Sequence, residues 1–176
     1  MNESVTLEPL TIADIPQIAP LAARIWRLHY TPIAGAEQVE YMLRQRYGVD
    51  DLMHSISAPD RWFEVLRVSG TIVGFLRCTQ KSGAEMKLEE IYLLDSQRGR
   101  GYGKMMLRRA ETIAREHGCN RLTLTVNKRN ASSIAVYLHE GFVNSGSIVF
   151  EIGNGFVMDD FIMEKKIKPN LGQALK

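Results

Sequence analysis

The sequence predicts a single α/β domain organised around one mixed sheet. The chain has 176 residues, of which 45% are hydrophobic and 24% are charged, and this size and composition are typical of one folded domain with its own core. The spacing of apolar residues changes along the chain, from helical spacing to alternation and then to strands and helices in turn. Residues 86–127 follow the order strand, helix, strand, which places two parallel strands in the same sheet.

The first third of the chain is predicted to hold one strand followed by helices. Val5–Leu10 alternates between apolar and polar residues, as expected of a half-buried strand. Thr11 stands three residues before Asp14, a spacing that resembles a capping box at a helix start. Pro16 and Pro20 interrupt the helical pattern that follows, so we expect a kinked helix or a late start. Two further helical segments are expected at 36–47 and 50–57.

The middle of the chain is predicted to form antiparallel strands. Residues 62–68 and 71–80 are rich in β-branched and aromatic side chains, and Ser69-Gly70 between them is a two-residue hairpin turn. A further strand is expected at 86–94. The remaining elements are a helix between Gly103 and Gly118, a strand at 121–127, a helix at 132–140 and a closing hairpin at 148–152 and 156–165.

Charge, cysteine content and hydropathy exclude several classes of protein. Lys and Arg total 22 against 20 Asp and Glu, a net charge of +2, so no nucleic-acid partner is expected. Cys78 and Cys119 are far apart and the four histidines lack ligand spacing, so we expect no metal site, no disulfide framework and reduced, cytoplasmic thiols. Neither a signal peptide nor an apolar run of about 20 residues is apparent, so no membrane partner is expected. The expectation is one cytoplasmic domain spanning 1–167 with a flexible tail at 168–176.

A glycine-rich turn at residues 93–104 is the most informative segment. It lies between a predicted strand and a predicted helix, where backbone N–H groups and the helix dipole favour an anion. Glycines let the backbone approach phosphate oxygens closely, and nearby cations add positive charge. The residues concerned are Arg98, Gly99, Arg100, Gly101, Gly103 and Lys104. A plain strand-to-helix turn is the alternative, which the three glycines disfavour.

Two familiar phosphate-binding motifs do not match this turn. A P-loop needs a glycine five residues before its Gly-Lys pair and a Ser or Thr after it, but those positions hold Arg98 and Met105. A dinucleotide-binding fingerprint needs the spacing G-x-G-x-x-G, and an acidic residue about 20 positions on, where this chain has Leu122. Both motifs are therefore excluded.

The turn instead resembles the acetyl-CoA-binding motif of the GNAT acetyltransferases, R/Q-x-x-G-x-G/A, through Arg98, Gly101 and Gly103. The resemblance continues downstream, where Asn130, Tyr137, Gly141 and Phe142 reproduce the family spacing N-x6-Y-x3-G-F. The pattern is most similar to that of bacterial spermidine/spermine-type N-acetyltransferases. The segments that carry this closer likeness are Ile91-Tyr92-Leu93-Leu94 and Trp26-Arg27-Leu28-His29-Tyr30.

The resemblance implies the fold, the activity and the cosubstrate. The fold would be a mostly antiparallel sheet of about seven strands flanked by about four helices, with the fourth and fifth strands splayed apart. The activity would be acetyl-CoA-dependent N-acetylation of a primary amine of a small molecule, such as a polyamine. Acetylation of a protein N-terminus or lysine, and a non-catalytic acyl-CoA-binding module, stay open as alternatives. An exposed edge strand would also allow a homodimer.

The resemblance also implies a set of acetyl-CoA-binding residues. Backbone groups of Ile91 and Leu93 would pair with the pantetheine amides, and the Leu93 N–H would polarise the thioester carbonyl. N–H groups from Gly99 to Lys104 would hold the pyrophosphate. Asn130 matches a position that touches the cofactor arm, and it is also a good N-cap for the helix that follows. The full set is Ile91, Leu93, Arg98, Gly99, Arg100, Gly101, Tyr102, Gly103, Lys104, Asn130 and Tyr137.

Tyr137 is the predicted general acid. After an amine attacks the thioester directly, the coenzyme A thiolate leaves, and a nearby phenol can give it a proton. The alternative is a tyrosine that only packs on the apolar face of a helix beside Ile134 and Leu138. The match of Tyr137 to the family spacing favours the catalytic role.

Glu89 is the predicted general base. An amine with a pKa of about 10.4 is mostly protonated at neutral pH and must lose a proton before it attacks. Some relatives carry a Glu on this strand at the position that Lys87 occupies here, so that assignment does not transfer. Glu89 shares strand parity with Lys87 unless a bulge intervenes, whereas Glu90 would face the other side. A solvated carboxylate, with a water chain as the base, is the alternative.

The acceptor site implied by the resemblance lies between the first helices and the last hairpin. Aromatic side chains there could line it and acidic side chains could attract a cationic amine, although aromatic residues at helical spacing more often belong to a core. The candidates are Trp26, His29, Tyr30, Tyr41, Glu151, Asp159 and Asp160.

Overall fold

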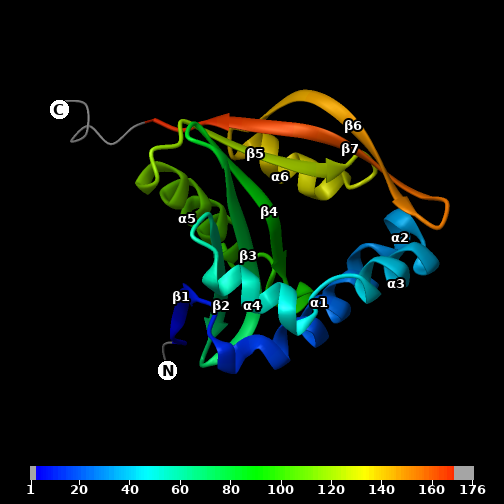
Figure 1. The fold of residues 1–176 in the computed structure, drawn as a ribbon, viewed down its shortest axis with the longest axis horizontal. Helices are drawn as coiled ribbons and strands as arrows, with labels where there is room; N and C mark the ends of the chain where they lie inside the picture. Colours follow the sequence, from blue (N-terminus) through cyan, green and yellow to red (C-terminus); the bar gives the residue numbers. More distant parts are fainter. Residues whose placement is uncertain (1–2, 169–176) are drawn as a thin grey trace.

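The structure is a computed structural model that describes residues 3–168 (Figure 1). The strands within this range are β1 (Val5–Pro9), β2 (Arg61–Val68), β3 (Thr71–Ser82), β4 (Glu85–Leu93), β5 (Arg121–Asn127), β6 (Val143–Gly153) and β7 (Phe156–Lys166). The α-helices are α1 (Ile15–His29), α2 (Thr31–Ala34), α3 (Ala36–Arg44), α4 (Val49–Ser57), α5 (Tyr102–Glu116) and α6 (Ala131–His139), with short 3-10 helices at Ile12–Asp14 and Asp95–Gln97. The predicted tail lies outside the described residues except for Lys168.

The strands form one seven-stranded sheet in the order β1-β2-β3-β4-β5-β7-β6, which confirms the predicted α/β class. Every neighbouring pair is antiparallel except β4 and β5. The parallel pair is the strand–helix–strand unit predicted from the sequence, with α5 as its crossover helix. Among the described residues, no helix is both long and apolar enough to cross a membrane.

Most element boundaries follow the predictions, and the differences have local causes. Ser69 and Gly70 adopt positive φ angles of 49° and 81°, as a two-residue hairpin turn requires. The first helix does not start late: it runs without interruption from Ile15 to His29, with Pro16 in its first turn and Pro20 inside it. The expected four helices become six within residues 3–168, since the second helical region divides into α3 and α4 and the single turn α2 precedes them.

The β4–β5 pair confirms the expected splay. Only Glu85–Lys87 of β4 pairs with β5, opposite Arg121–Thr123. Beyond that point β4 keeps its pairing with β3, and β5 keeps its pairing with β7. The sheet therefore opens into a gap between the two strands, which Figure 1 shows diverging.

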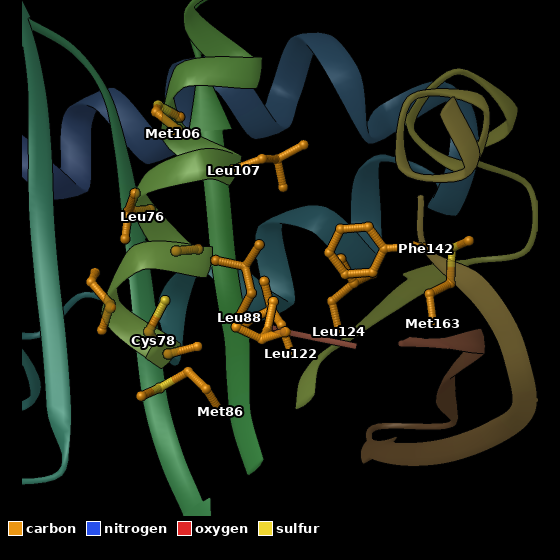
Figure 2. Packing of buried hydrophobic residues seen from close by; sticks show 14 of the residues in the cluster. Leu76, Cys78, Met86, Leu88, Met106, Leu107, Leu122, Leu124, Phe142 and Met163 are labelled. Atoms are coloured by element: carbon orange, nitrogen blue, oxygen red, sulfur yellow. The ribbon is translucent and has the colours of Figure 1, made fainter. Parts of the chain in front are cut away.

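Two apolar clusters cover the two faces of the sheet. One lies under α5 and contains Met106 and Leu107 with Leu76 and Leu88 from the strands, as Figure 2 shows. The other lies under α1, α3 and α4, where Ile18, Val39 and Leu52 pack on strand residues such as Phe75. Neighbouring strand residues such as Phe75 and Leu76 alternate between the two clusters. Each fully buried side chain of this size contributes about 1.5–3 kcal/mol, so both layers stabilise the sheet that carries the gap.

The β6–β7 hairpin folds back onto α3. The Tyr41 hydroxyl donates a hydrogen bond to the Ile152 carbonyl at 2.8 Å, and the Gln38 amide donates one to the Val157 carbonyl at 2.9 Å. The Tyr41 ring also packs on Phe156. These contacts join the far end of the β5–β7–β6 part of the sheet to the helices that cover the other part.

Candidate active site

Two cavities meet at the gap between β4 and β5. The first, called the loop cavity, measures about 320 Å³ and is lined by β4, the 98–104 turn, α5 and α6. The second, called the hairpin cavity, measures about 370 Å³ and is lined by α1, α3, β4, β5 and the β6–β7 hairpin. Tyr92 and Tyr137 line both cavities. The two cavities therefore share part of their walls.

The turn of the loop cavity presents backbone N–H groups to its ligand. Gly99 and Gly101 have φ angles of +75° and +83°, a left-handed conformation that side chains with a Cβ rarely adopt. Gly101 is the N-cap of α5, and Met105 N–H donates the first hydrogen bond within that helix, to the Gly101 carbonyl at 3.0 Å. The N–H groups between them are those that a helix start leaves free for an anion.

The three cations of the turn point to different places. Arg98 and Lys104 line the loop cavity, although Lys104 also forms an ion pair with Glu140 at 3.1 Å. Arg100 does not line it, because its guanidinium bonds to Gln97 and Glu3 and lies over the Tyr102 ring. The expected charge around the turn is therefore concentrated on two of the three side chains.

The edge of β4 along the gap carries unpaired backbone groups. Leu94 N–H donates to the Val73 carbonyl of β3 at 2.9 Å. Bonded and non-bonded pairs alternate along an antiparallel ladder, so the backbone groups of Leu93 and Ile91, which stand opposite Gly74 and Leu76, point away from β3 into the gap. An extended ligand with amide groups could pair with this edge as a further strand does.

Asn130 and Tyr137 lie on the opposite wall of the gap. The buried Asn130 side chain accepts a hydrogen bond from Ser133 N–H at 3.3 Å and caps α6, and it also lines the hairpin cavity. Tyr137 packs on Phe142, so part of its ring serves the core. Burial raises the pKa of the Tyr137 phenol above its ordinary value, which keeps the hydroxyl protonated and able to donate a proton.

The residues predicted for the acceptor site divide into two groups. Trp26, Tyr30, Glu151 and Asp160 line the hairpin cavity. The others do not: the Tyr41 hydroxyl bonds to Ile152, Asp159 forms an ion pair with Lys128 at 2.6 Å, and His29 contacts Arg98 at 3.3 Å. Sequence spacing placed these side chains on the right elements but could not show which way each one points.

Glu89 lines the hairpin cavity beside Lys87, but two cations hold it. Its carboxylate forms ion pairs with Lys81 at 2.8 Å and Lys87 at 2.9 Å. Burial raises the pKa of Glu89, but the hydrogen bonds from both lysines outweigh burial and leave the pKa below its ordinary value. A carboxylate with a lowered pKa is a weaker proton acceptor.

A β-bulge at Glu89 changes the alternation of β4. Arg77 of β3 pairs with Glu90, whereas the next residue, Cys78, pairs with Leu88, which leaves Glu89 as the extra residue. After the bulge, the buried Glu90 contacts Tyr47 and the Arg77 guanidinium. The bulge that the parity argument allowed for is thus present. The alternation of apolar and polar residues along β4 does not reveal it.

Among the described residues, the acidic groups of the hairpin cavity that no ion pair engages are Glu151 and Asp160, and Asp160 of β7 is the buried one. Its side chain is 1% exposed, and its Oδ1 atom has no hydrogen-bond partner there. Burial, together with the neighbouring Asp159 charge, raises the pKa of Asp160 to about 6. The strand pattern gave no reason to rank it above Asp159, because only the packing of β7 on β5 separates the two.

The comparisons with known proteins agree with this geometry. The family model described as Acetyltransferase (GNAT) family matches residues 22–142. The chain is 26% identical over 167 residues to a spermidine N(1)-acetyltransferase of Thermoplasma acidophilum, covering 93% of this chain and 98% of that protein. No group of three or more His, Cys, Asp and Glu side chains suited to a metal occurs in the described part of the chain.

Solved structures show the same fold. The PaiA N-acetyltransferase of Thermoplasma acidophilum, in complex with coenzyme A, superimposes with a TM-score of 0.79 at 27% identity, covering 93% of this chain and 99% of that one. The ribosomal-protein-S18-alanine N-acetyltransferase of Escherichia coli matches with a TM-score of 0.71 at 19% identity, over 98% of this chain and 99% of that one, a likeness of fold alone.

The unpaired strand edge, the N–H groups of the turn and its cations fit an elongated ligand with amides and a diphosphate. The chain belongs to the GNAT acetyltransferase family and is an acyltransferase that uses acetyl-CoA as its donor.

Proposed function

We propose that this enzyme acetylates a primary amine of a small cationic molecule such as a polyamine. The observation that carries the proposal is the hairpin cavity, which combines aromatic walls with the carboxylates of Glu151 and Asp160 and meets the loop cavity at Tyr137. Aromatic faces and unneutralised carboxylates are the groups that attract alkylammonium ions. The 26% identity to a spermidine N(1)-acetyltransferase supports the same class of acceptor.

The loop cavity would hold acetyl-CoA. The backbone of Ile91 and Leu93 would pair with its pantetheine amides, and the N–H groups from Gly99 to Lys104, with Arg98, would hold its diphosphate. When bound, acetyl-CoA supplies the thioester that is the acetyl donor. Leu93 N–H would bond to the thioester oxygen and stabilise the negative charge that develops there.

Tyr137 would act as the general acid. It lines both cavities, so the acceptor amine and the thioester would meet beside it. Its raised pKa keeps the hydroxyl protonated at neutral pH, so a proton is available to the sulfur as the carbon–sulfur bond breaks. Asn130 would fix this wall of the site, because its cap on Ser133 N–H starts the helix that carries Tyr137.

Two measurements test the proposal in sequence. Acetyl-CoA at about 100 times its Kd should stabilise the protein by about 2.7 kcal/mol, a rise in Tm of roughly 5–10 °C for a chain of this size. Release of free thiol is then measured with a panel of diamines, spermidine, spermine, neutral-chain monoamines, and peptides carrying a free N-terminus or lysine. We expect turnover with polyamines and little with monoamines that lack a second charge.

Each outcome decides between the open functions. Absence of any shift in Tm with millimolar acetyl-CoA would exclude donor binding altogether. A shift in Tm without thiol release on any acceptor would indicate a non-catalytic acyl-CoA-binding module. Turnover restricted to peptides would replace the small amine with a protein acceptor.

A further inference from the structure

The carboxylate of Asp160 is buried in the wall of the hairpin cavity without an ion-pair partner among the described residues. It lines the hairpin cavity and is 1% exposed, and its Oδ1 has no hydrogen-bond partner among the described residues. A buried charge without a partner is destabilising, and such groups persist where a site uses them. On β7, Asp160 stands opposite Asn127 of β5, three residues before Asn130, which starts the helix of Tyr137. Asp160 and Tyr137 therefore line the same cavity from neighbouring parts of the fold.

The charged groups around Asp160 are already engaged with other partners. Lys87 is bound to Glu89, and Arg46 lies 3.6 Å from Glu90. Asp159, its neighbour on β7, is bound to Lys128 at 2.6 Å. Thr125 of β5 and the Tyr30 phenol of α1 also face Asp160. Since no cation of the described chain neutralises this carboxylate, a cationic ligand in the cavity can do so.

We propose that Asp160 binds the ammonium group of the acceptor and takes the proton that this group must lose before it attacks. The inference rests on the proposed function and deepens it, because it assigns the proton acceptor of the same site. It also replaces Glu89 in that role, since the Glu89 carboxylate is held by Lys81 and Lys87, whereas Asp160 forms no ion pair among the described residues and meets only the Thr125 hydroxyl. Proton transfer occurs directly or through one water molecule, which is within the reach of a general base.

The protons and bonds of the step balance as follows. One proton passes from R–NH3+ to Asp160, and the neutral nitrogen forms a bond to the thioester carbonyl carbon as the carbon–sulfur bond breaks. Tyr137 gives its hydroxyl proton to the departing sulfur and recovers a proton from the nitrogen, which becomes the amide. Asp160 releases its proton to solvent, so the products are R–NH–acetyl, coenzyme A thiol and one H+.

The test compares D160N with wild type by measuring kcat/KM for spermidine across pH 5 to pH 10. If Asp160 takes the proton, wild-type activity is flat between about pH 6, below which Asp160 is protonated, and the amine pKa near 10. D160N can use only the free amine, so its activity is lower by about 10²-fold near neutral pH and rises about tenfold per pH unit toward the amine pKa. E89Q removes the competing carboxylate and should still give a profile that is flat between these limits, whatever its absolute level.

Other outcomes overturn the assignment. A D160N profile with the wild-type shape but a lower level would mean a structural role, and a higher KM with unchanged kcat would mean binding without proton transfer. A rising profile in E89Q instead of D160N would make Glu89 the base. An H29Q variant should still lose activity below about pH 6, because His29 contacts Arg98 and does not line the hairpin cavity.

A stability measurement shows whether D160N is folded, and the activity of wild type separates the two proposals. The pKa of Asp160 is raised in the fold, so its charge destabilises the protein above about pH 6, and the effect disappears as the pH falls toward the unfolded pKa of about 3.9. D160N should therefore have a higher Tm than wild type at pH 8 and the same Tm at pH 4. If wild type itself acetylates no amine, the proposed function fails; if wild type is active and D160N matches it, only the role of Asp160 fails.

Discussion

The loop cavity and the hairpin cavity are built by different means. The loop cavity is formed by the edge of β4, the glycine turn that starts α5, and side chains of α5 and α6, and its lining comes from residues 91–137. The hairpin cavity is made of side chains drawn from α1, α3, the β4 bulge and the β6–β7 hairpin, between residues 26 and 160. One site depends on local conformation, and the other depends on how distant segments pack.

This difference explains what each site can recognise. Backbone N–H groups and a strand edge bind diphosphate and amides through features that many side-chain sequences can form. Side chains from separate helices and strands can instead be changed one at a time, which suits the choice of an amine. Substitutions in the two cavities should therefore change different kinetic constants.

The largest effect is expected at Tyr137, where the two cavities meet. Y137F should lower kcat by roughly 10²-fold, because the departing thiolate loses its proton donor. The Kd for acetyl-CoA, measured by calorimetry, should change little, since the ring still packs on Phe142. Unchanged kcat would contradict the general-acid role, and an equal loss in Kd would place Tyr137 in donor binding instead.

A smaller effect is expected at the glycine turn. G101A should weaken acetyl-CoA binding by about tenfold, because a Cβ at φ +83° costs roughly 1–2 kcal/mol and shifts the N–H groups of the turn. The added Cβ would meet no atom within 4 Å, so conformation and not a clash is under test.

Gly118, just beyond the other end of α5, provides the matched control. It also has a left-handed conformation, at φ +73°, with no atom within 4 Å of an added Cβ. The strain in G118A should lower Tm about as much as the strain in G101A does, but it should leave the Kd for acetyl-CoA unchanged. Equal losses of affinity in both variants would mean that strain in α5, and not the shape of the turn, controls donor binding.

The smallest effect distinguishes the two arginines of the turn. R98A should weaken acetyl-CoA binding by about threefold to fivefold, a modest loss because its side chain is 42% exposed and partly screened. R100A should leave the Kd within error, since that side chain turns toward Glu3 and Gln97. Titrations at low and high salt check the assignment, because only the contribution of Arg98 should fall with salt.

Prediction from sequence succeeded where the determinants are local. The boundaries of β5, the Ser69-Gly70 turn and the helix after the glycine turn follow from spacing alone. The splay of β4 from β5 came from the family resemblance and is confirmed by the short β4–β5 ladder. The directions of Arg98 and Arg100 differ although both lie in the same turn, and no spacing rule separates them.

The acceptor site was less predictable because its determinants are tertiary. The bulge at Glu89 arises from the register between β3 and β4, and the two lysines that bind its carboxylate come from both strands. Asp159 and Asp160 are adjacent in sequence, but one pairs with Lys128 and the other is buried in the cavity wall. Which acid is available can be decided only once β7 is placed on β5.

The β6–β7 hairpin, which is hydrogen-bonded to α3 through Gln38 and Tyr41, has a consequence for how such enzymes diversify. The hairpin supplies Glu151 and Asp160 to the hairpin cavity, yet none of its residues lines the loop cavity. The family match also ends at residue 142, before the hairpin begins. Mutations along this last segment can therefore change the amine that is accepted while the machinery that holds the acetyl donor is inherited intact, so one donor site can serve many substrates over the course of evolution.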